Sequence, residues 1–307
     1  MCSIGRSQTG GQGMATPMGT LGVWAFIDGM SAPEAAAFAG RLEEWGYGAL
    51  WLPEAVGRDP FTIISYMAAQ TERIVFATGI ANIYARDPMS MNAIRRTVGE
   101  LAPGRFVMGL GVSHAPLVAD IRGHDYGKPV TTMRNYLEKM EQALFMSVPA
   151  EQEAPIVLAA LRTNMLKLAA DKTAGAHPYF VPPEHTAKAR DTMGSEAWLC
   201  PEQMVLLETD AEKARAIARQ HMATYIDLPN YRNNLLELDF TTDDFENGGS
   251  DKLVDAIVAW GDEAAIRTRI QAHWDAGADH VTIQPFRPDG EMGPDEDLLA
   301  RLAPTAG

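Results

Sequence analysis

The stretch FATGIANIYARDP (residues 76–88) begins with apolar residues, breaks at Gly79, and brings in Asn82, Tyr84 and Arg86 before Pro88. A short apolar run that ends at a glycine is typical of a buried strand, and a proline is typical of the first turn of a helix. The stretch therefore predicts one strand-to-helix unit, and it raises the question of what the polar side chains at the end of the strand do.

The same unit recurs along the chain in both directions. Buried strands are predicted at 21–27, 49–53, 74–80, 106–112, 155–161, 176–181, 204–209 and 280–285. Apolar residues at helical spacing lie between most of them, and an irregular insertion at 230–249 precedes the last strand. Strands that alternate with helices in this number predict an α/β fold, a (β/α)8 TIM barrel with an insertion before the last strand. An open doubly wound sheet is the alternative, but no G-x-G-x-x-G motif follows the first strand.

Composition narrows the class of protein. The formal net charge of −14 argues against a nucleic-acid surface, which needs an excess of Lys and Arg. With only Cys2 and Cys200, the chain can form neither a disulfide framework nor a cysteine metal cluster, and it suits a reducing cytoplasm. The sequence contains no run of 18 apolar residues, so no membrane-spanning segment is predicted. Residues 1–19 are small and polar and predict a disordered tail, with 20–307 as one domain.

Candidate site residues follow from the predicted barrel, because active sites of this fold are assembled at the carboxyl ends of the strands. The polar residues at those positions are Glu54, Asn82, Ser113, His114, Arg162, Thr163, Asn164, His177, Tyr179 and Gln284. Each also has a structural interpretation: Glu54 would pair with Arg58 or cap a segment, Asn82 would hold a turn, and His114 would be a hydrogen-bonded histidine.

Two other kinds of site are disfavoured. The seven histidines are scattered and none forms an H-E-x-x-H pair, so no metal site is predicted. A nucleophilic hydrolase is unsupported because there is no G-x-S-x-G motif. A polar, metal-free barrel mouth suits an organic cofactor.

Several blocks carry a family resemblance, among them ALWLPEAVGRDPF, IVFATGIANIYARDPMSM, ELAPGRFVMGLGVSHAPLV and AGADHVTIQPF. From about Leu21 to Ala303 the chain resembles the luciferase-like monooxygenase superfamily, in particular an actinobacterial branch of coenzyme F420-dependent oxidoreductases. The resemblance implies coenzyme F420 as cofactor, with FMN as the alternative found elsewhere in the superfamily. It also implies a small-molecule substrate and a homodimer.

The resemblance assigns roles to residues. It implies a non-prolyl cis peptide at Gly79-Ile80 that backs the cofactor ring, and Asn82, Val112 and Ser113 beside the cofactor. His114 would be the proton donor and Glu54 the second catalytic candidate. The remaining residues expected at the cofactor are Ala160, Arg162, Thr163, Asn164, His177 and Tyr179.

The chain departs from the family in two places. Ala55 stands where many members have a histidine, and AALRTNM stands where close relatives read AALGPKM. Arg162 would either pair with a cofactor phosphate or occlude a site built for glycine. We therefore expect hydride transfer between F420 and a small organic substrate. A reduced-FMN monooxygenase and a non-catalytic cofactor-binding protein are the alternatives.

Overall fold

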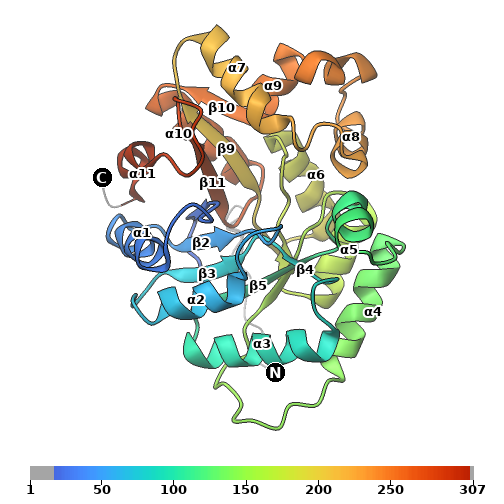
Figure 1. The fold of residues 1–307 in the computed structure, drawn as a ribbon. Helices are drawn as coiled ribbons and strands as arrows, with labels where there is room; N and C mark the ends of the chain where they lie inside the picture. The colour runs from blue at the N-terminus through green and yellow to red at the C-terminus, as the bar shows by residue number, and fades with distance from the viewer. Residues whose placement is uncertain (1–16, 305–307) are drawn as a thin grey trace, which may run out of the picture.

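Strands β1 (Leu21–Trp24), β2 (Ala49–Leu52), β3 (Val75–Thr78) and β5 (Phe106–Gly111) pair side by side, each parallel to the next. The computed structural model describes residues 17–304. The row continues through β6 (Ile156–Leu158), β7 (Gly175–Ala176) and β8 (Trp198–Leu199), again with parallel pairing (Figure 1). Parallel strands in one sheet need crossover connections, which the intervening helices supply.

The segment 198–207 closes the sheet into a barrel. Its first part, β8, pairs with β7, and its second part, β9 (Glu202–Leu207), pairs with β11 (Val281–Phe286). Strand β11 pairs with β1, so the row of strands returns to its start. The predicted (β/α)8 barrel is confirmed. Three short strands were not predicted: β8, β4 (Ala81–Asn82), which pairs with β5, and β10 (Val258–Gly261), which pairs with β9.

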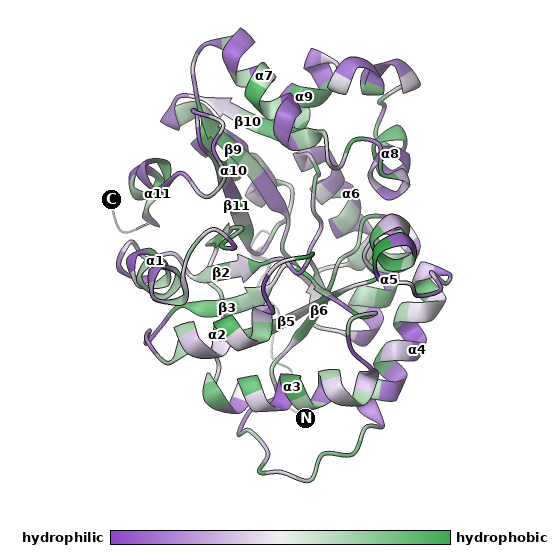
Figure 2. Cartoon of the chain, viewed as in Figure 1, coloured by the Kyte–Doolittle hydropathy of each residue, from purple (hydrophilic) through white to green (hydrophobic). Residues whose placement is uncertain are grey.

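Helices wrap the outside of the barrel and alternate with the strands. They are α1 (Ala32–Glu44), α2 (Pro60–Ala68), α3 (Pro88–Leu101), α4 (Pro129–Glu141), α5 (Thr163–Lys172), α6 (Pro183–Met193), α7 (Ala211–Met222), α10 (Glu263–Asp275) and α11 (Glu296–Leu302). Local chemistry starts several of them: Asp59 and Asp87 accept hydrogen bonds from first-turn amides, and Ser31 forms a capping box with Glu34. Figure 2 shows hydrophobic strands inside and mixed, partly hydrophilic helices outside.

The insertion before the last strand is mostly helical, whereas the sequence predicted an irregular segment at 230–249. It contains α8 (Pro229–Leu236), a 3-10 helix η2 (Thr242–Gly248) and α9 (Asp251–Ile257). Buried Tyr231, Leu235, Phe240 and Phe245 pack it against α7 and β9. Residues 230–249 show no helical periodicity because α8 has only 8 residues and η2 is a 3-10 helix of 7 residues.

Large side chains fill the barrel interior. Trp24, Trp51 and Cys200 pack there with Met18, whose side chain has no exposed surface. Met18 is therefore part of the fold, although the sequence placed it in a tail of residues 1–19; residues 1–16 lie outside the described part. Gly48 allows this approach, because a Cβ there would lie 1.8 Å from the Met18 carbonyl oxygen. Within residues 17–304, no helix is long and apolar enough to cross a membrane.

Candidate active site at the barrel mouth

The peptide bond between Gly79 and Ile80 is cis, as the family resemblance implied. It follows the end of β3, at the carboxyl end of the barrel. The indole Nε1 of Trp24, the last residue of β1, donates a 2.9 Å hydrogen bond to the Gly79 carbonyl oxygen. Gly79 has no room for a side chain, since a Cβ would lie 2.6 Å from that indole nitrogen. The chain at Gly79-Ile80, called the bulge below, therefore packs directly against Trp24.

The Ile80 side chain lies against a glycine face of β5. A Cβ on Gly111 would come within 2.4 Å of the Ile80 Cδ1 atom, so only glycine leaves this space. Asn82 pairs with Gly111 in the β4–β5 ladder and is fully buried. Its Oδ1 accepts from the Tyr84 amide at 2.9 Å, and its Nδ2 has no hydrogen-bond partner among the described residues. Asn82 thus holds a turn, the structural role considered above, and keeps one free donor behind Ile80.

Glu54 is held by two partners. Its carboxylate accepts from the Asn82 amide at 2.9 Å and forms a 2.7 Å ion pair with Arg86, which also pairs with Asp59. The predicted alternative, a pair with Arg58, is wrong. Glu54 fixes the end of β2 to the bulge after β3, and this geometry favours a supporting role over proton transfer.

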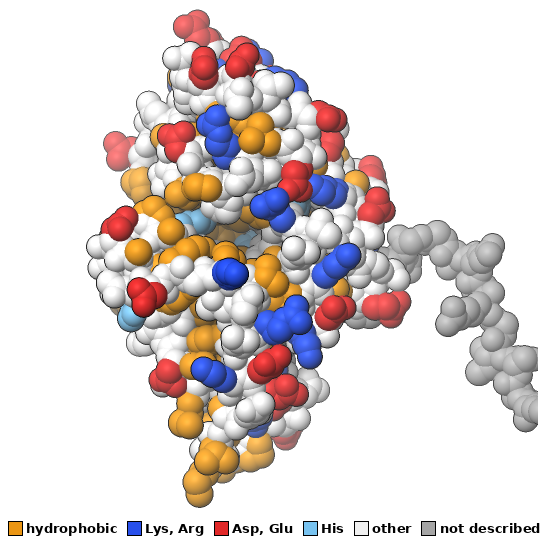
Figure 3. All heavy atoms as spheres, turned by 90° about the vertical axis from the view of Figure 1, so that its right-hand side faces the viewer, with side chains coloured by type: hydrophobic (Ala, Val, Ile, Leu, Met, Phe, Trp, Pro, Cys, Tyr) orange, Lys and Arg blue, Asp and Glu red, His pale blue; other side chains and the backbone are white. Residues whose placement is uncertain are grey.

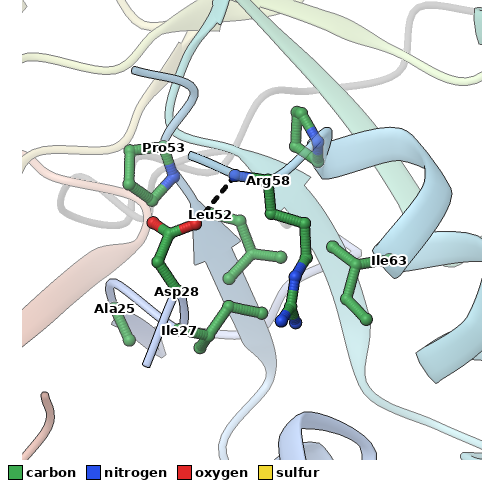
Figure 4. Close-up of a pocket in the computed structure, with 8 residues that line it drawn as sticks. Ala25, Ile27, Asp28, Leu52, Pro53, Arg58 and Ile63 are labelled. Carbon is green, nitrogen blue, oxygen red and sulfur yellow. Dashed lines mark hydrogen bonds between the residues drawn. The ribbon is translucent and has the colours of Figure 1, made fainter. Parts of the chain in front are cut away.

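Arg58 faces a different part of the mouth. Its amide donates to Asp28 at 2.8 Å (Figure 4). Its guanidinium donates to the Met30 carbonyl oxygen at 2.6 Å. Beside it lies a cavity of about 10 Å³ next to Leu52 and Pro53. This is the volume of a single water molecule and is too small for a cofactor.

The segment after β5 brings Val112, Ser113 and His114 to the mouth, all half-buried. Ser113 has φ = 55°, and its carbonyl oxygen accepts from the Tyr126 hydroxyl at 3.1 Å. The His114 ring lies 5.5 Å from the Tyr231 ring of α8, measured between centroids. Burial lowers the pKa of His114 below its usual range, and a hydrogen bond with Asn230 opposes this only in part. At neutral pH the imidazole is therefore mainly uncharged.

The loop after β6 ends at the N-terminus of α5. Ala160 is buried, whereas Arg162, Thr163 and Asn164 are exposed. Arg162 turns toward α8 and forms a 2.7 Å ion pair with Glu237, which also binds Lys188 at 2.7 Å. No side chain caps this end of α5, so its first amides face the solvent at the mouth.

His177 and Tyr179 follow β7 and face the barrel interior. His177 is 1% exposed and stacks on Trp51 with ring centroids 4.4 Å apart, and burial lowers its pKa to about 4. It is therefore buried beside Gly79, where a Cβ on Gly79 would lie 3.2 Å from its Nε2 atom. Tyr179 is half-buried, packs 5.1 Å from the Trp24 ring, and donates a 2.9 Å hydrogen bond to the Gln284 side-chain oxygen.

One buried acid was missed by the sequence analysis. Glu202 opens β9, is 1% exposed, and its Oε2 accepts from the Phe180 amide at 3.2 Å. Burial raises its pKa to about 8, and the Phe180 amide opposes this only in part. The strand was predicted to begin at Met204, which left Glu202 in a loop. The alternation Cys200, Glu202, Met204 was the available signal for an inward-facing side chain.

These positions make a mouth that fits a planar ring cofactor. The Ile80 side chain and the Trp24–Tyr179 pair form apolar walls, Asn82 keeps an unsatisfied donor, and the α5 N-terminus offers amides to an anionic group. In Figure 3, hydrophobic side chains gather around a hollow near the middle of the molecule. Within residues 17–304 no three His, Cys, Asp or Glu side chains converge as metal ligands.

Residues 6–280 match the family described as luciferase-like monooxygenase, and the chain belongs to this family. A relative from Mycobacterium tuberculosis named "Putative coenzyme F420-dependent oxidoreductase" is 27% identical over 135 residues, 44% of this chain and 38% of that protein. The chain spans about a third of the length of the first curated relatives, 38% and 30%.

Solved structures share the fold over nearly the whole chain. An F420-dependent secondary alcohol dehydrogenase in complex with an F420-acetone adduct has a TM-score of 0.73 at 13% identity, covering 96% of this chain and 100% of that one. The oxygenating constituent of 3,6-diketocamphane monooxygenase from Pseudomonas putida, a type II Baeyer-Villiger monooxygenase in complex with FMN, has a TM-score of 0.68 at 13% identity, covering 93% and 97%. The family and the barrel class expected from the sequence are thus confirmed. The relative and the two solved structures described above are, by their names, oxidoreductases.

Proposed function

We propose that the chain is a coenzyme F420-dependent oxidoreductase that transfers a hydride between the deazaflavin and a small organic substrate. The observation that carries the proposal is the platform at the end of β3, where the Ile80 side chain lies against a glycine face of β5. The names of the M. tuberculosis relative and of the alcohol dehydrogenase support F420 as the cofactor.

The bound deazaflavin would supply a ring carbon that carries the hydride. The chain supplies the surroundings: Ile80 and Trp24 bound the ring site with apolar surface, and the Trp24–Gly79 hydrogen bond fixes the bulge. Such walls orient a flat ring and exclude water from one of its faces. Val112 and Ser113, which follow β5, would line the ring site from that side.

His114 is the residue we assign to proton transfer, at one of its imidazole nitrogens. Because burial lowers its pKa, the imidazole is uncharged near neutral pH and is ready to accept a proton. An alcohol that loses a hydride from its carbon must also lose its hydroxyl proton, and neutral His114 can take it. In the reverse direction, the reduction of a carbonyl compound, the protonated imidazole would donate that proton.

Arg162 is assigned to the anionic part of the cofactor. The guanidinium is exposed and already pairs with Glu237, so a phosphate near the α5 N-terminus would compete with that carboxylate for it. Thr163 and Asn164 would offer their amides to the same phosphate. The other outcome considered from the sequence, that Arg162 occludes the site, predicts tighter cofactor binding after its removal.

The test of the function is a titration of the purified protein with coenzyme F420 and, separately, with FMN, followed by cofactor fluorescence. Saturable binding of F420 alone supports the proposal. Binding of FMN alone would replace it by the reduced-FMN monooxygenase, which the structural likeness to the FMN-bound Pseudomonas protein keeps open. Binding of neither cofactor at micromolar concentration would indicate a non-catalytic relative.

A His114→Gln variant tests the proton transfer. We expect turnover to fall by about 100-fold or more with little change in F420 affinity, because the imidazole acts on the substrate proton and not on the ring. The exposed His124 gives a matched control, and His124→Gln should keep full turnover. Equal turnover of His114→Gln and the parent protein would remove His114 from the mechanism.

A cytoplasmic location and a homodimer remain predictions of the sequence and its family resemblance. Size-exclusion chromatography with light scattering measures the second: a mass of twice 33.4 kDa supports the dimer, and a single chain mass contradicts it.

A further inference from the structure

Glu202 is hydrogen-bonded on both sides of Tyr179. Its backbone amide donates to the Pro178 carbonyl oxygen at 2.9 Å, and its carboxyl Oε2 accepts from the Phe180 amide at 3.2 Å. Phe180 has φ = 61°, in the left-handed region that non-glycine residues seldom adopt. The carboxyl group therefore holds the turn in which Tyr179 leaves β7 for the barrel mouth.

Among residues 17–304, no cation pairs with the Glu202 carboxyl. Burial dominates its titration, its Oε1 has no hydrogen-bond partner within the described part of the chain, and neither does the hydroxyl of Thr282, its register partner on β11. The titratable groups that face it are the hydroxyls of Tyr179, Tyr225 and Tyr231. Burial is the main cause that raises the pKa of each, and the charge of Glu202 raises it further. For Tyr179 and Tyr231 the charge of Tyr225 contributes more than that of Glu202. A buried carboxylate in such surroundings is costly, and a proton removes the cost.

Tyr179 connects this acid to the candidate cofactor platform. Its ring lies 5.1 Å from the Trp24 ring, and the Trp24 indole nitrogen binds the Gly79 carbonyl oxygen of the cis peptide at 2.9 Å. The Tyr179 hydroxyl donates to Gln284 at 2.9 Å, which fixes the ring from the β11 side. The connection thus runs from Glu202 to the backbone on both sides of Tyr179, and from the Tyr179 ring through Trp24 to Gly79.

We propose that Glu202 is a positioning residue that, while it carries a proton, holds Tyr179 against Trp24 and so keeps the barrel mouth ready for a ring cofactor. When the proton leaves for the solvent, the carboxylate needs donors, and the candidates are the hydroxyl of Thr282 and the three tyrosine hydroxyls that face it. The Tyr179 hydroxyl then turns from Gln284 toward Glu202, and its ring moves relative to Trp24. The proposal rests on the proposed function only for the identity of the ligand.

The first experiment uses the protein without any cofactor. Near-ultraviolet circular dichroism, which reports the packing of tyrosine and tryptophan rings, is recorded from pH 6.5 to pH 9.5. We expect a one-proton transition with a midpoint near pH 8 in the parent protein, and no transition in Glu202→Gln. Glu212→Gln changes an exposed glutamate and should keep the transition. A transition that persists in Glu202→Gln, or is missing from the parent, overturns the proposal.

The second experiment measures the affinity of coenzyme F420 and of FMN over the same pH range. If only the protonated form binds, the dissociation constant rises about tenfold between pH 7 and pH 9 in the parent. The affinity of Glu202→Gln should stay constant, and Tyr179→Phe, which keeps the ring but loses the hydroxyl, should lose most of the pH dependence. A parent affinity that is flat across this range contradicts the proposal. If neither cofactor binds at any pH, the proposed function fails, while the dichroism still decides the role of Glu202.

Discussion

Replacing Glu202 by glutamine should change how the stability of the protein depends on pH. The unfolded carboxyl has a pKa of about 4.5, and burial raises it to about 8 in the fold. Between these values the folded chain holds a proton that the unfolded chain has lost, so the stabilisation is full below pH 4.5 and is lost as pH rises through 8. Over the whole interval this amounts to about 5 kcal/mol.

The assay is urea unfolding of the parent and of Glu202→Gln from pH 6.5 to pH 9, followed by tryptophan fluorescence. The difference in unfolding free energy between the two proteins should fall by about 2 kcal/mol over this range, as the parent loses its proton and the amide loses nothing. Buried histidines titrate in the opposite sense, but they are present in both proteins and cancel in the difference. Glutamine keeps the size of the side chain and an oxygen for the Phe180 amide.

A constant difference across this range, within about 0.5 kcal/mol, would refute the reasoning. It would mean that the folded carboxyl has the same proton affinity as the unfolded one. Glu212→Gln serves again as the control, since an exposed glutamate should leave the pH dependence of the parent unchanged.

Three further predictions follow from the site and the core. Gly111→Ala places a Cβ 2.4 Å from the Ile80 Cδ1 atom, so we expect cofactor affinity to fall about tenfold or more with an unchanged far-ultraviolet spectrum; Gly29→Ala, which meets nothing within 4 Å, should change neither. Arg162→Ala should lower the free energy of unfolding by less than about 1 kcal/mol because its ion pair with Glu237 is exposed. Weaker F420 binding by this variant would support a phosphate-binding role for Arg162, and tighter binding would support occlusion of the site. Burial lowers the pKa of four histidines to about 4 or below: His177, His185, His273 and His280. Each therefore contributes about 3 kcal/mol of stability above pH 6.5 that is lost as the pH falls toward 4. Urea midpoints that rise on acidification would contradict this.

The barrel could be predicted because its strands are apolar and regularly spaced. Each barrel strand is buried on both faces, so runs such as ALWLP and FVMGLGV stand out in the sequence. Strand β10 was missed because VAWG follows directly on α9 and reads as the end of that helix. Met18 was missed because one apolar residue in a polar stretch has no period, and only the barrel floor gives it a partner.

The site was predictable only in part, for a similar reason. The rule that functional residues lie at the strand ends selected Asn82, His114 and Tyr179, which the structure places at the mouth. It also selected His177, whose ring is buried against Trp51. Sequence position along a strand does not tell which layer of the barrel a side chain occupies. Glu202 was overlooked for the complementary reason, since a carboxylate at the start of a strand is usually exposed.

His114 and Glu202 are both uncharged near neutral pH, and this bears on which substrates the site would accept. Burial lowers the pKa of His114 and raises that of Glu202, so both groups are uncharged near pH 7. The cation Arg86 is balanced by Glu54 and Asp59 on the other side of the bulge. On the side of His114 and Glu202 a ring cofactor would thus meet side chains without charge, whereas the cation Arg58 lies at a different part of the mouth. We therefore expect neutral alcohols or carbonyl compounds to be turned over in preference to carboxylates of the same size, and a screen of such matched pairs that favours the carboxylate would contradict this view of the mouth.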